Sequence, residues 1–118
     1  MKTKKYSISG NNLNNLIEML KTKSFITDFK DYYTQTYDKC HVFAFEKYYM
    51  RTASSLLITI FVIERKENIY DIDILVGGGG TGVLNLNYWS ETSAINKAVE
   101  PIRNISKKYN WNIVEKKS

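Results

Sequence analysis

The segment from Ile69 to Val76 constrains the fold of this chain more than any other stretch. Charged residues alternate with apolar ones from Tyr70 to Ile74, and a two-residue period is typical of a strand with one buried face and one exposed face. The inward residues would be Tyr70, Ile72, Ile74 and Val76, and the outward ones Asp71 and Asp73. Because clean alternation is typical of antiparallel sheets, we expect a sheet with one face packed on a core.

The preceding run, from Ser55 to Arg65, is apolar on both of its alternating faces. Only the charged turn Lys66-Glu67-Asn68 separates this run from the strand over Ile69 to Val76, so the two should form a hairpin. We expect this apolar strand to be central, flanked by its neighbours in sequence, and covered on both faces for much of its length. An edge position would leave it open to pairing with other chains, so any dimer should use a different edge.

Further strands are indicated on both sides of this hairpin. The segment from His41 to Arg51 alternates, with Phe43 and Phe45 on one face and Val42 and Ala44 on the other. The aromatic spacing before it suits a helix or a strand, and its β-branched and aromatic residues favour a strand. Weaker patterns predict a short strand at Tyr6 and Ile8, the strand over Phe25 to Asp38, and a last strand around Trp111 and Ile113. They also predict a strand after the glycines, with Leu84, Leu86 and Tyr88 inward and Asn85 and Asn87 outward.

Two segments have the apolar spacing of amphipathic helices. The first, residues 11–23, follows Gly10 and has asparagines available as N-caps. The second begins near Ser90 and Thr92, also candidate N-caps, and contains Pro101, which should kink the helix or make it restart. The apolar stripes are Leu13, Leu16, Ile17 and Leu20 in the first and Ala94, Ile95, Ala98, Val99, Ile102, Ile105 and Tyr109 in the second.

These elements predict the fold class. The order is one strand, a helix, about five strands in succession, a helix and a final strand. Short connections make successive strands antiparallel, because a parallel return needs a crossover of about a dozen residues. We therefore expect residues 1–118 to form a single α+β domain of two layers, a mostly antiparallel sheet of about five to seven strands with two amphipathic helices.

Three pieces of the chain resemble a small, uncharacterised bacterial family of the type called domain of unknown function 6054. They are the run from Cys40 to Tyr48, the sequence Ser54-Ser55-Leu56-Leu57, and the segment from Gly77 to Trp89. The resemblance extends from about Asp28 to Ile95 and favours a strand before Cys40. It implies no known activity, so no functional residues are carried over from it.

Composition limits the partners and the location. The formal charge of +5 suggests nucleic acid, but the bias toward Lys, Asn, Ile and Tyr is typical of any protein from an AT-rich genome. Arginine, which suits phosphate and guanine contacts, occurs only at Arg51, Arg65 and Arg103, so nucleic-acid binding is disfavoured. The longest apolar stretch is too short to span a membrane. The single Cys40 and the absence of an apolar segment behind the charged N-terminus predict a cytoplasmic protein.

The glycine run is the main candidate site. Positions 77–82 hold five of the six glycines of the chain, and ordered glycines are costly in backbone entropy. We expect a hairpin loop or β-bulge with at least one glycine at positive φ; a loop that contacts a ligand or partner is the alternative. A phosphate cradle is disfavoured, because the run should lead into a strand and lacks Gly-Lys-Ser or Gly-Lys-Thr. The site residues are Gly77, Gly78, Gly79, Gly80, Thr81 and Gly82.

Other chemistry-bearing residues have simpler interpretations. Asp71 and Asp73 could join Asn85 and Asn87 around a hard cation, but a solvated outer face of a hairpin is the favoured explanation. His41 is the only histidine and has no identifiable catalytic partner or fellow metal ligand. The aromatic residues from Tyr32 to Tyr49, beside Lys30, Lys39, Lys47 and Arg51, could be a stacking platform for single-stranded nucleic acid, or core and edge residues.

The sequence therefore predicts no catalytic residues, no metal and no cofactor. We expect a cytoplasmic accessory or interaction domain that is not an enzyme. It should bind a protein partner or small ligand and be a monomer or homodimer. One alternative is a small-ligand-binding protein or enzyme that uses the loop from Gly77 to Gly82. A second is an RNA-binding module. The lysine-rich termini, with Lys2, Lys4, Lys5, Lys116 and Lys117, are expected to be surface features without defined structure at their tips.

Overall fold

A computed structural model gives the fold and describes residues 1–22, 29–49, 54–78 and 86–117. These ranges contain six strands and two helices, so the α+β prediction is confirmed. In chain order the elements are β1 (Lys2–Ser9), α1 (Asn14–Lys21), β2 (Phe29–Tyr37), β3 (Cys40–Tyr49), β4 (Ser54–Lys66), β5 (Ile69–Gly78), α2 (Leu86–Lys108) and β6 (Asn112–Lys116).

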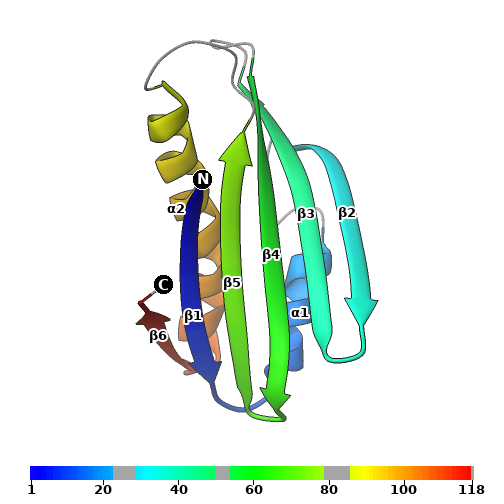
Figure 1. Cartoon of the computed structure of the whole chain (residues 1–118). Helices are drawn as coiled ribbons and strands as arrows, with labels where there is room; N and C mark the ends of the chain where they lie inside the picture. The colour runs from blue at the N-terminus through cyan, green and yellow to red at the C-terminus, as the bar shows by residue number, and fades with distance from the viewer. Residues whose placement is uncertain (23–28, 50–53, 79–85, 118) are drawn as a thin grey trace.

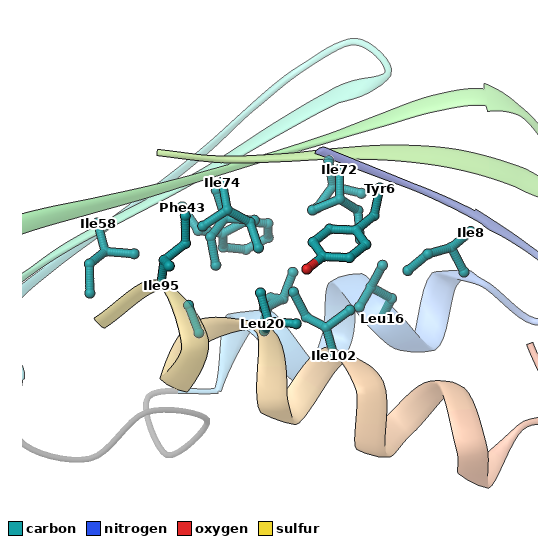
Figure 2. Close-up of a cluster of buried hydrophobic side chains, with 14 of the residues drawn as sticks. Tyr6, Ile8, Leu16, Leu20, Phe43, Ile58, Ile72, Ile74, Ile95 and Ile102 are labelled. Carbon is teal, nitrogen blue, oxygen red and sulfur yellow. The ribbon is translucent and has the colours of Figure 1, made fainter. Parts of the chain in front are cut away.

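The strands form one antiparallel sheet in the order β2-β3-β4-β5-β1-β6. From β2 to β5 each strand pairs with the next one in sequence. β1 pairs along the other side of β5, and β6 pairs along the far side of β1, so the two ends of the chain lie together (Figure 1). Both helices lie on the same face of the sheet, which we call the inner face; the opposite one is the outer face (Figures 1 and 2).

The core lies between the inner face and the two helices (Figure 2). The alternation of β5 predicts this correctly, since its inward residues are all buried. The predicted helical stripes are buried as well, apart from their partly buried ends Ile105 and Tyr109. Core residues from the strands include Tyr6, Ile8, Phe43, Phe45, Ile58, Ile60, Ile72 and Ile74, and those from the helices include Leu16, Ile17, Leu20, Ala94, Ile95, Ala98, Val99 and Ile102.

The apolar strand β4 is central, as predicted, with β3 on one side and β5 on the other. The expectation that both of its faces are covered is wrong. Its inward residues Leu56, Ile58, Ile60 and Val62 are at most 1% exposed, whereas Leu57 on the outer face is 49% exposed. Apolar composition on both faces of a strand cannot distinguish a second packed layer from an apolar surface.

The strand predicted for residues 84–88 is also wrong. α2 begins at Leu86, so Leu86 and Tyr88 belong to a helix, while Leu84 and Asn85 lie outside the described residues. Leu86 and Trp89 also have the three-residue spacing of a helix, and periodicity does not separate helix from strand in so short an apolar run. The succession of strands therefore has four members, β2 to β5, rather than five.

The other strand predictions are confirmed with changed bounds. The ambiguous segment before Cys40 is β2 from Phe29 to Tyr37, and residues 25–28 lie outside the described part of the chain. The final strand is β6. The first strand is much longer than Tyr6 and Ile8 indicated, because β1 pairs with β5 from Lys2 opposite Val76 onward.

The expectation of unstructured lysine-rich tips is therefore wrong for most of these residues. Lys2, Lys4 and Lys5 lie in β1, and Lys116 lies in β6 opposite Lys5. Backbone pairing along β5 holds this end of the chain in place, and it does not require apolar side chains at every position.

The predicted helix ends differ from those observed. Leu13, not an asparagine, is the N-cap of α1, and no side chain caps that end by a hydrogen bond. Asn12 instead has a positive φ of 61°, and its carbonyl accepts the backbone N–H of Asn15. Ser90 and Thr92 lie inside α2, which continues through Pro101 without restarting.

Candidate functional site

The outer face of the sheet is the most exposed apolar feature of the described structure. Both helices cover the inner face, and no element within the described ranges packs on the outer one (Figure 1). Cross-strand pairing brings outward residues of three strands together, because Phe61 lies between Val42 and Asp73, and Thr59 between Ala44 and Leu75. The apolar members of this patch, which we call the outer patch, are Val42, Ala44, Leu57, Phe61, Ile63 and Leu75.

Leu57 is the most prominent member of the outer patch. Nearly half of its surface is exposed, although it belongs to a central strand. A hollow of about 170 Å³ opens beside it, lined by Tyr32, Tyr33, Ala44, Phe45, Glu46 and Leu57. On the β2 side the patch is bordered by Tyr33 and Tyr37, which are 52% and 59% exposed. An apolar centre beside a hollow, with aromatic residues at its border, is typical of a protein-binding surface.

The opposite border of the outer patch is charged but internally neutralised. Arg65 Nη1 donates to Asp71 Oδ2 at 2.8 Å, and Lys116 Nζ donates to Asp71 Oδ1 at 2.9 Å. Lys5 Nζ lies 4.0 Å from Asp73 Oδ2. Both carboxylates thus face lysine or arginine from neighbouring strands or turns.

These ion pairs replace the cation site considered from the sequence. Asn87 lies in α2 rather than on a strand beside β5, and Asn85 lies outside the described residues. The described part of the chain contains no group of three or more His, Cys, Asp and Glu that could hold a metal ion. Asp71 and Asp73 therefore form ion pairs that link neighbouring strands of the sheet.

A row of polar side chains crosses the inner face at the end of the sheet where β2 meets β3 and β4 meets β5. His41 Nδ1 and Thr36 Oγ1 are 3.0 Å apart, and His41 Nε2 and Glu64 Oε2 are 2.5 Å apart. The hydroxyl of Tyr70 donates to Glu64 Oε1 at 3.3 Å. We call these four residues the polar row. His41 is only 8% exposed, so these bonds supply the partners that a buried imidazole requires.

The polar row has defined electrostatics. Burial, followed by the charge and the hydrogen bond of Glu64 and the charge of Glu67, raises the pKa of Tyr70 above its ordinary value of 10.0. A carboxylate accepts from the imidazole Nε2–H when His41 is neutral, which leaves Nδ1 to accept the hydroxyl proton of Thr36. The hydrogen bonds of the row then all point one way, with Thr36 donating to His41 and His41 donating to Glu64.

Sequence reasoning missed the polar row. It treated His41 as a residue without a partner, and the structure supplies Thr36 and Glu64. The signal was partly present, because the alternation that buries Phe43 also turns His41 inward, and the alternation of β4 turns Glu64 the same way. The pairing register that brings the two together was not available from those local patterns.

Comparison with known proteins gives the family. The family described as a family of unknown function, DUF6054, matches residues 3–106. The chain belongs to this family. The match contains all three pieces on which the sequence resemblance rests and extends beyond them at both ends. No curated protein matches the chain. In the described part of this DUF6054 domain, neither helix combines the length and the apolar character needed to cross a membrane.

Only the first two residues of the glycine run belong to the described part of the DUF6054 domain. Gly77 and Gly78 are the last residues of β5, and the next described element is α2. The prediction that the run leads into a strand, which also served to disfavour a phosphate cradle, is therefore wrong. Neither Gly77 nor Gly78 has a positive φ, whereas Gly10 does. Gly79, Gly80, Thr81 and Gly82 lie outside the described residues, and ligand contact by the run stays a prediction.

Two hollows near the ends of the sheet do not involve Gly77. One of about 590 Å³ is lined by Gly10, Asn11, Asn12, Glu67 and Asn68. Another of about 380 Å³ is lined by Thr3, Lys4, Glu115, Lys116 and Lys117. The second adjoins the outer patch, because Thr3 pairs with Leu75, and Glu67 of the first lies near enough to Tyr70 to raise its pKa.

The aromatic residues considered as a stacking platform are divided between the two faces. Phe43 and Phe45 are buried in the core, and Tyr32 is partly buried and donates its hydroxyl to the carbonyl of Leu20 at 2.5 Å. Tyr33 and Tyr37 are exposed on the outer face. The side chains of Tyr48 and Tyr49 lie outside the description. The described aromatic residues therefore do not form one continuous platform.

Proposed function

We propose that this DUF6054 domain is a non-catalytic interaction domain, and that a partner protein binds the outer face of its sheet. The observation that carries the proposal is the exposure of Leu57 within the outer patch. One face of an antiparallel sheet commonly faces water, but the residues on that face are then mostly polar. Contiguous exposed apolar surface is typical of sites that another molecule covers.

The charges of the outer face favour a protein as the partner. Nucleic acid binds to unpaired lysine and arginine, which exchange counterions for phosphates. On this face, Arg65 and Lys116 are engaged by Asp71, and Lys5 lies beside Asp73. The face is thus apolar at its centre and neutralised at its charged border, despite the net charge of +5.

The hollow beside Leu57 indicates how a partner would be held. Interfaces derive much of their binding energy from a few side chains that fill well-packed pockets. A volume of about 170 Å³ accommodates one apolar side chain rather than an extended ligand. We therefore expect the partner to insert one aliphatic or aromatic residue between Tyr33 and Leu57.

The polar row supports the non-catalytic part of the proposal. Both ring nitrogens of His41 and both carboxylate oxygens of Glu64 have partners within the row. Such mutual satisfaction is what a buried structural histidine requires. The cytoplasmic location expected from the single Cys40 remains part of the proposal.

The test compares two equally exposed apolar residues. Leu57 and Val114 are 49% and 50% exposed, but Val114 lies on the edge strand β6, separated from the strand of Leu57 by β5 and β1 and beyond the charged border at Asp71. The parent chain, Leu57→Glu and Val114→Glu would be used to capture proteins from extracts of the source cells, and each captured protein would then be purified and titrated by calorimetry. We expect a partner whose affinity falls at least about tenfold for Leu57→Glu and is unchanged for Val114→Glu.

Other results would overturn the proposal. Equal losses for the two variants would indicate a nonspecific apolar contact. A captured protein that is a second copy of this chain would make the outer face a self-association surface. Binding of single-stranded RNA with the same dependence on Leu57 would replace the protein partner by nucleic acid.

An enzymatic function has one observation in its favour, the hydroxyl–imidazole–carboxylate order of Thr36, His41 and Glu64. The same order activates a hydroxyl nucleophile in acyl-transfer enzymes. Thr36 is an exposed residue, although its hydroxyl is hydrogen-bonded to His41. Hydrolysis of a p-nitrophenyl ester that Thr36→Val abolishes and Thr36→Ser retains would establish this alternative in place of the interaction domain.

A further inference from the structure

The two edges of the sheet are protected to very different degrees. β6 is five residues long and contains Glu115 and Lys116, and Lys117 follows it. Charges and short length are the usual devices that keep an edge from pairing with another chain. β2 is nine residues long, and the stretch from Tyr32 to Tyr37 contains neither a charged residue nor proline. Within the described sheet, β2 pairs only with β3 (Figure 1).

The exposed part of β2 is a palindrome. Residues 33–37 read Tyr-Thr-Gln-Thr-Tyr in both directions, with Gln35 at the centre. Two antiparallel copies of this strand with Gln35 opposite Gln35 would place Tyr33 opposite Tyr37 and Thr34 opposite Thr36. Aromatic pairs and threonine pairs are favourable cross-strand neighbours, and no like charges meet within these five positions.

The strand is held ready for such pairing. Residues 33–37 are all exposed, and continuous pairing with β3 from Tyr32 to Tyr37 holds the backbone of β2 in an extended conformation. The hydroxyl of Tyr32 bonds the Leu20 carbonyl, which ties the strand to α1. The hydroxyls of Tyr33 and Tyr37 lie 3.5 Å apart on the outer face. Little conformational freedom therefore remains to be lost when a second strand adds.

From these observations we infer that the chain forms a two-fold symmetric dimer, in which β2 pairs antiparallel with β2 of a second copy around Gln35. Two six-stranded sheets then become one continuous sheet. A two-fold axis brings identical residues together at its centre, and a self-complementary strand satisfies this requirement. The dimer uses an edge and leaves the outer patch open, so it goes beyond the proposed function and does not depend on it.

The test changes Gln35, the residue that lies on the proposed two-fold axis. The two side chains at Gln35 would be neighbours only in this register, so a charge there meets itself. Sedimentation analysis of the full chain should give a dimer of the 13.7 kDa chain. We expect Gln35→Lys and Gln35→Glu each to weaken the dimer at least about tenfold, because like charges face one another. Mixing these two variants should restore a dimer that contains one copy of each.

The mixing experiment separates pairing from a folding defect, because a misfolded variant is not rescued by its oppositely charged counterpart. Val114→Lys on the outward surface of β6 is the control, and its dimer should match that of the parent. A parent that sediments as a monomer at every accessible concentration overturns the inference. So does a dimer that Gln35→Lys and Gln35→Glu leave intact, or two variants that stay monomeric when mixed.

Discussion

The Nε2 of His41 and the Oε2 of Glu64 lie 2.5 Å apart, although 23 positions separate the two residues in sequence. His41 belongs to β3 and Glu64 to β4, and the register of these strands sets His41 opposite Val62, one inward position away from Glu64. A diagonal contact of this kind is within reach of long side chains on one face of a sheet. The contact gives the Nε2 of the one histidine in the chain a hydrogen-bond partner.

The first prediction concerns this pair. Glu64→Leu should lower the free energy of unfolding by about 1–3 kcal/mol, because it leaves the buried polar groups of His41 and Tyr70 without their acceptor. Glu18→Leu is the control, since Glu18 forms an exposed pair with Lys21 and should change stability by less than about 0.5 kcal/mol. Urea denaturation measures both. In a double-mutant cycle with His41→Leu, the losses should fall short of additivity; additive losses would mean that the two side chains do not interact.

The second prediction concerns Gly10 and Trp111. The indole Nε1 of Trp111 donates to the Asn11 carbonyl at 2.6 Å, and the ring stacks on Tyr109 with centroids 5.1 Å apart. A Cβ on Gly10 would clash with this indole, and φ at Gly10 is +154°. Gly10→Ala should therefore cost about 2 kcal/mol or more by combining steric overlap with backbone strain.

Gly77→Ala is the matched control for that change. Its new methyl group would meet the side chain of Met1 at 3.7 Å, which is an ordinary contact, and the backbone there has no positive φ. Thermal unfolding should show little change for Gly77→Ala and a clear loss for Gly10→Ala. Equal effects would contradict the assignment of the strained glycine.

The third prediction concerns alkaline pH. Burial raises the pKa of Tyr70 and of Tyr6 above 10.0 in the folded chain, and nearby Glu64 and Glu115 act in the same direction. The neutral hydroxyls are therefore favoured by folding, and this stability is complete below pH 10.0. As the pH rises through the folded pKa values, the unfolded chain releases protons first and the free energy of unfolding falls.

Urea titrations between neutral and alkaline pH test this dependence. Tyr70→Phe should flatten the alkaline decline, because the substituted ring cannot ionise in either state. Tyr33→Phe is the comparison at an exposed position, where the hydrogen bond with Tyr37 also raises the pKa, and it should flatten the decline less than Tyr70→Phe because its ring is not buried. A Tyr70→Phe variant that keeps the full slope above pH 10.0 would show that Tyr70 does not contribute to it.

The fourth prediction concerns the N-terminus. Removal of residues 1–4 should lower the melting temperature by about 4 °C or more, because it deletes three cross-strand pairs with β5, from Lys2 opposite Val76 to Lys4 opposite Ile74. A chain that lacks its last two residues, which follow β6, is the comparison and should melt close to the parent. An unchanged melting temperature after the N-terminal deletion would contradict the pairing of β1 over its full length.

The fifth prediction concerns Tyr6. Its hydroxyl is buried and has no hydrogen-bond partner of good geometry among the described residues, although Arg103 and Glu115 lie near enough to influence its pKa. Tyr6→Phe should leave stability unchanged or raise it by up to about 1 kcal/mol, because it removes a polar group that burial penalises. A loss of more than about 1 kcal/mol would reveal a hydrogen bond from this hydroxyl to Arg103 or Glu115.

The sequence by itself determined the local elements of this protein. The alternation of apolar and charged residues predicted which face of β5 is buried, including Ile72 and Ile74, and the stripe from Ala94 to Ile102 predicted the buried side of α2. Short connections predicted antiparallel neighbours. These properties follow from backbone geometry, which fixes the two-residue period of a strand and the 3.6-residue period of a helix.

Only the tertiary structure decided how the elements combine. It inserted β1 between β5 and β6, covered one face of the sheet and left Leu57 exposed on the other, and brought Glu64 to His41. It also made Leu86 the start of a helix where local alternation predicted a strand. Each of these results depends on contacts between residues far apart in the chain, and the free energy of such contacts is not encoded in the period of any single segment.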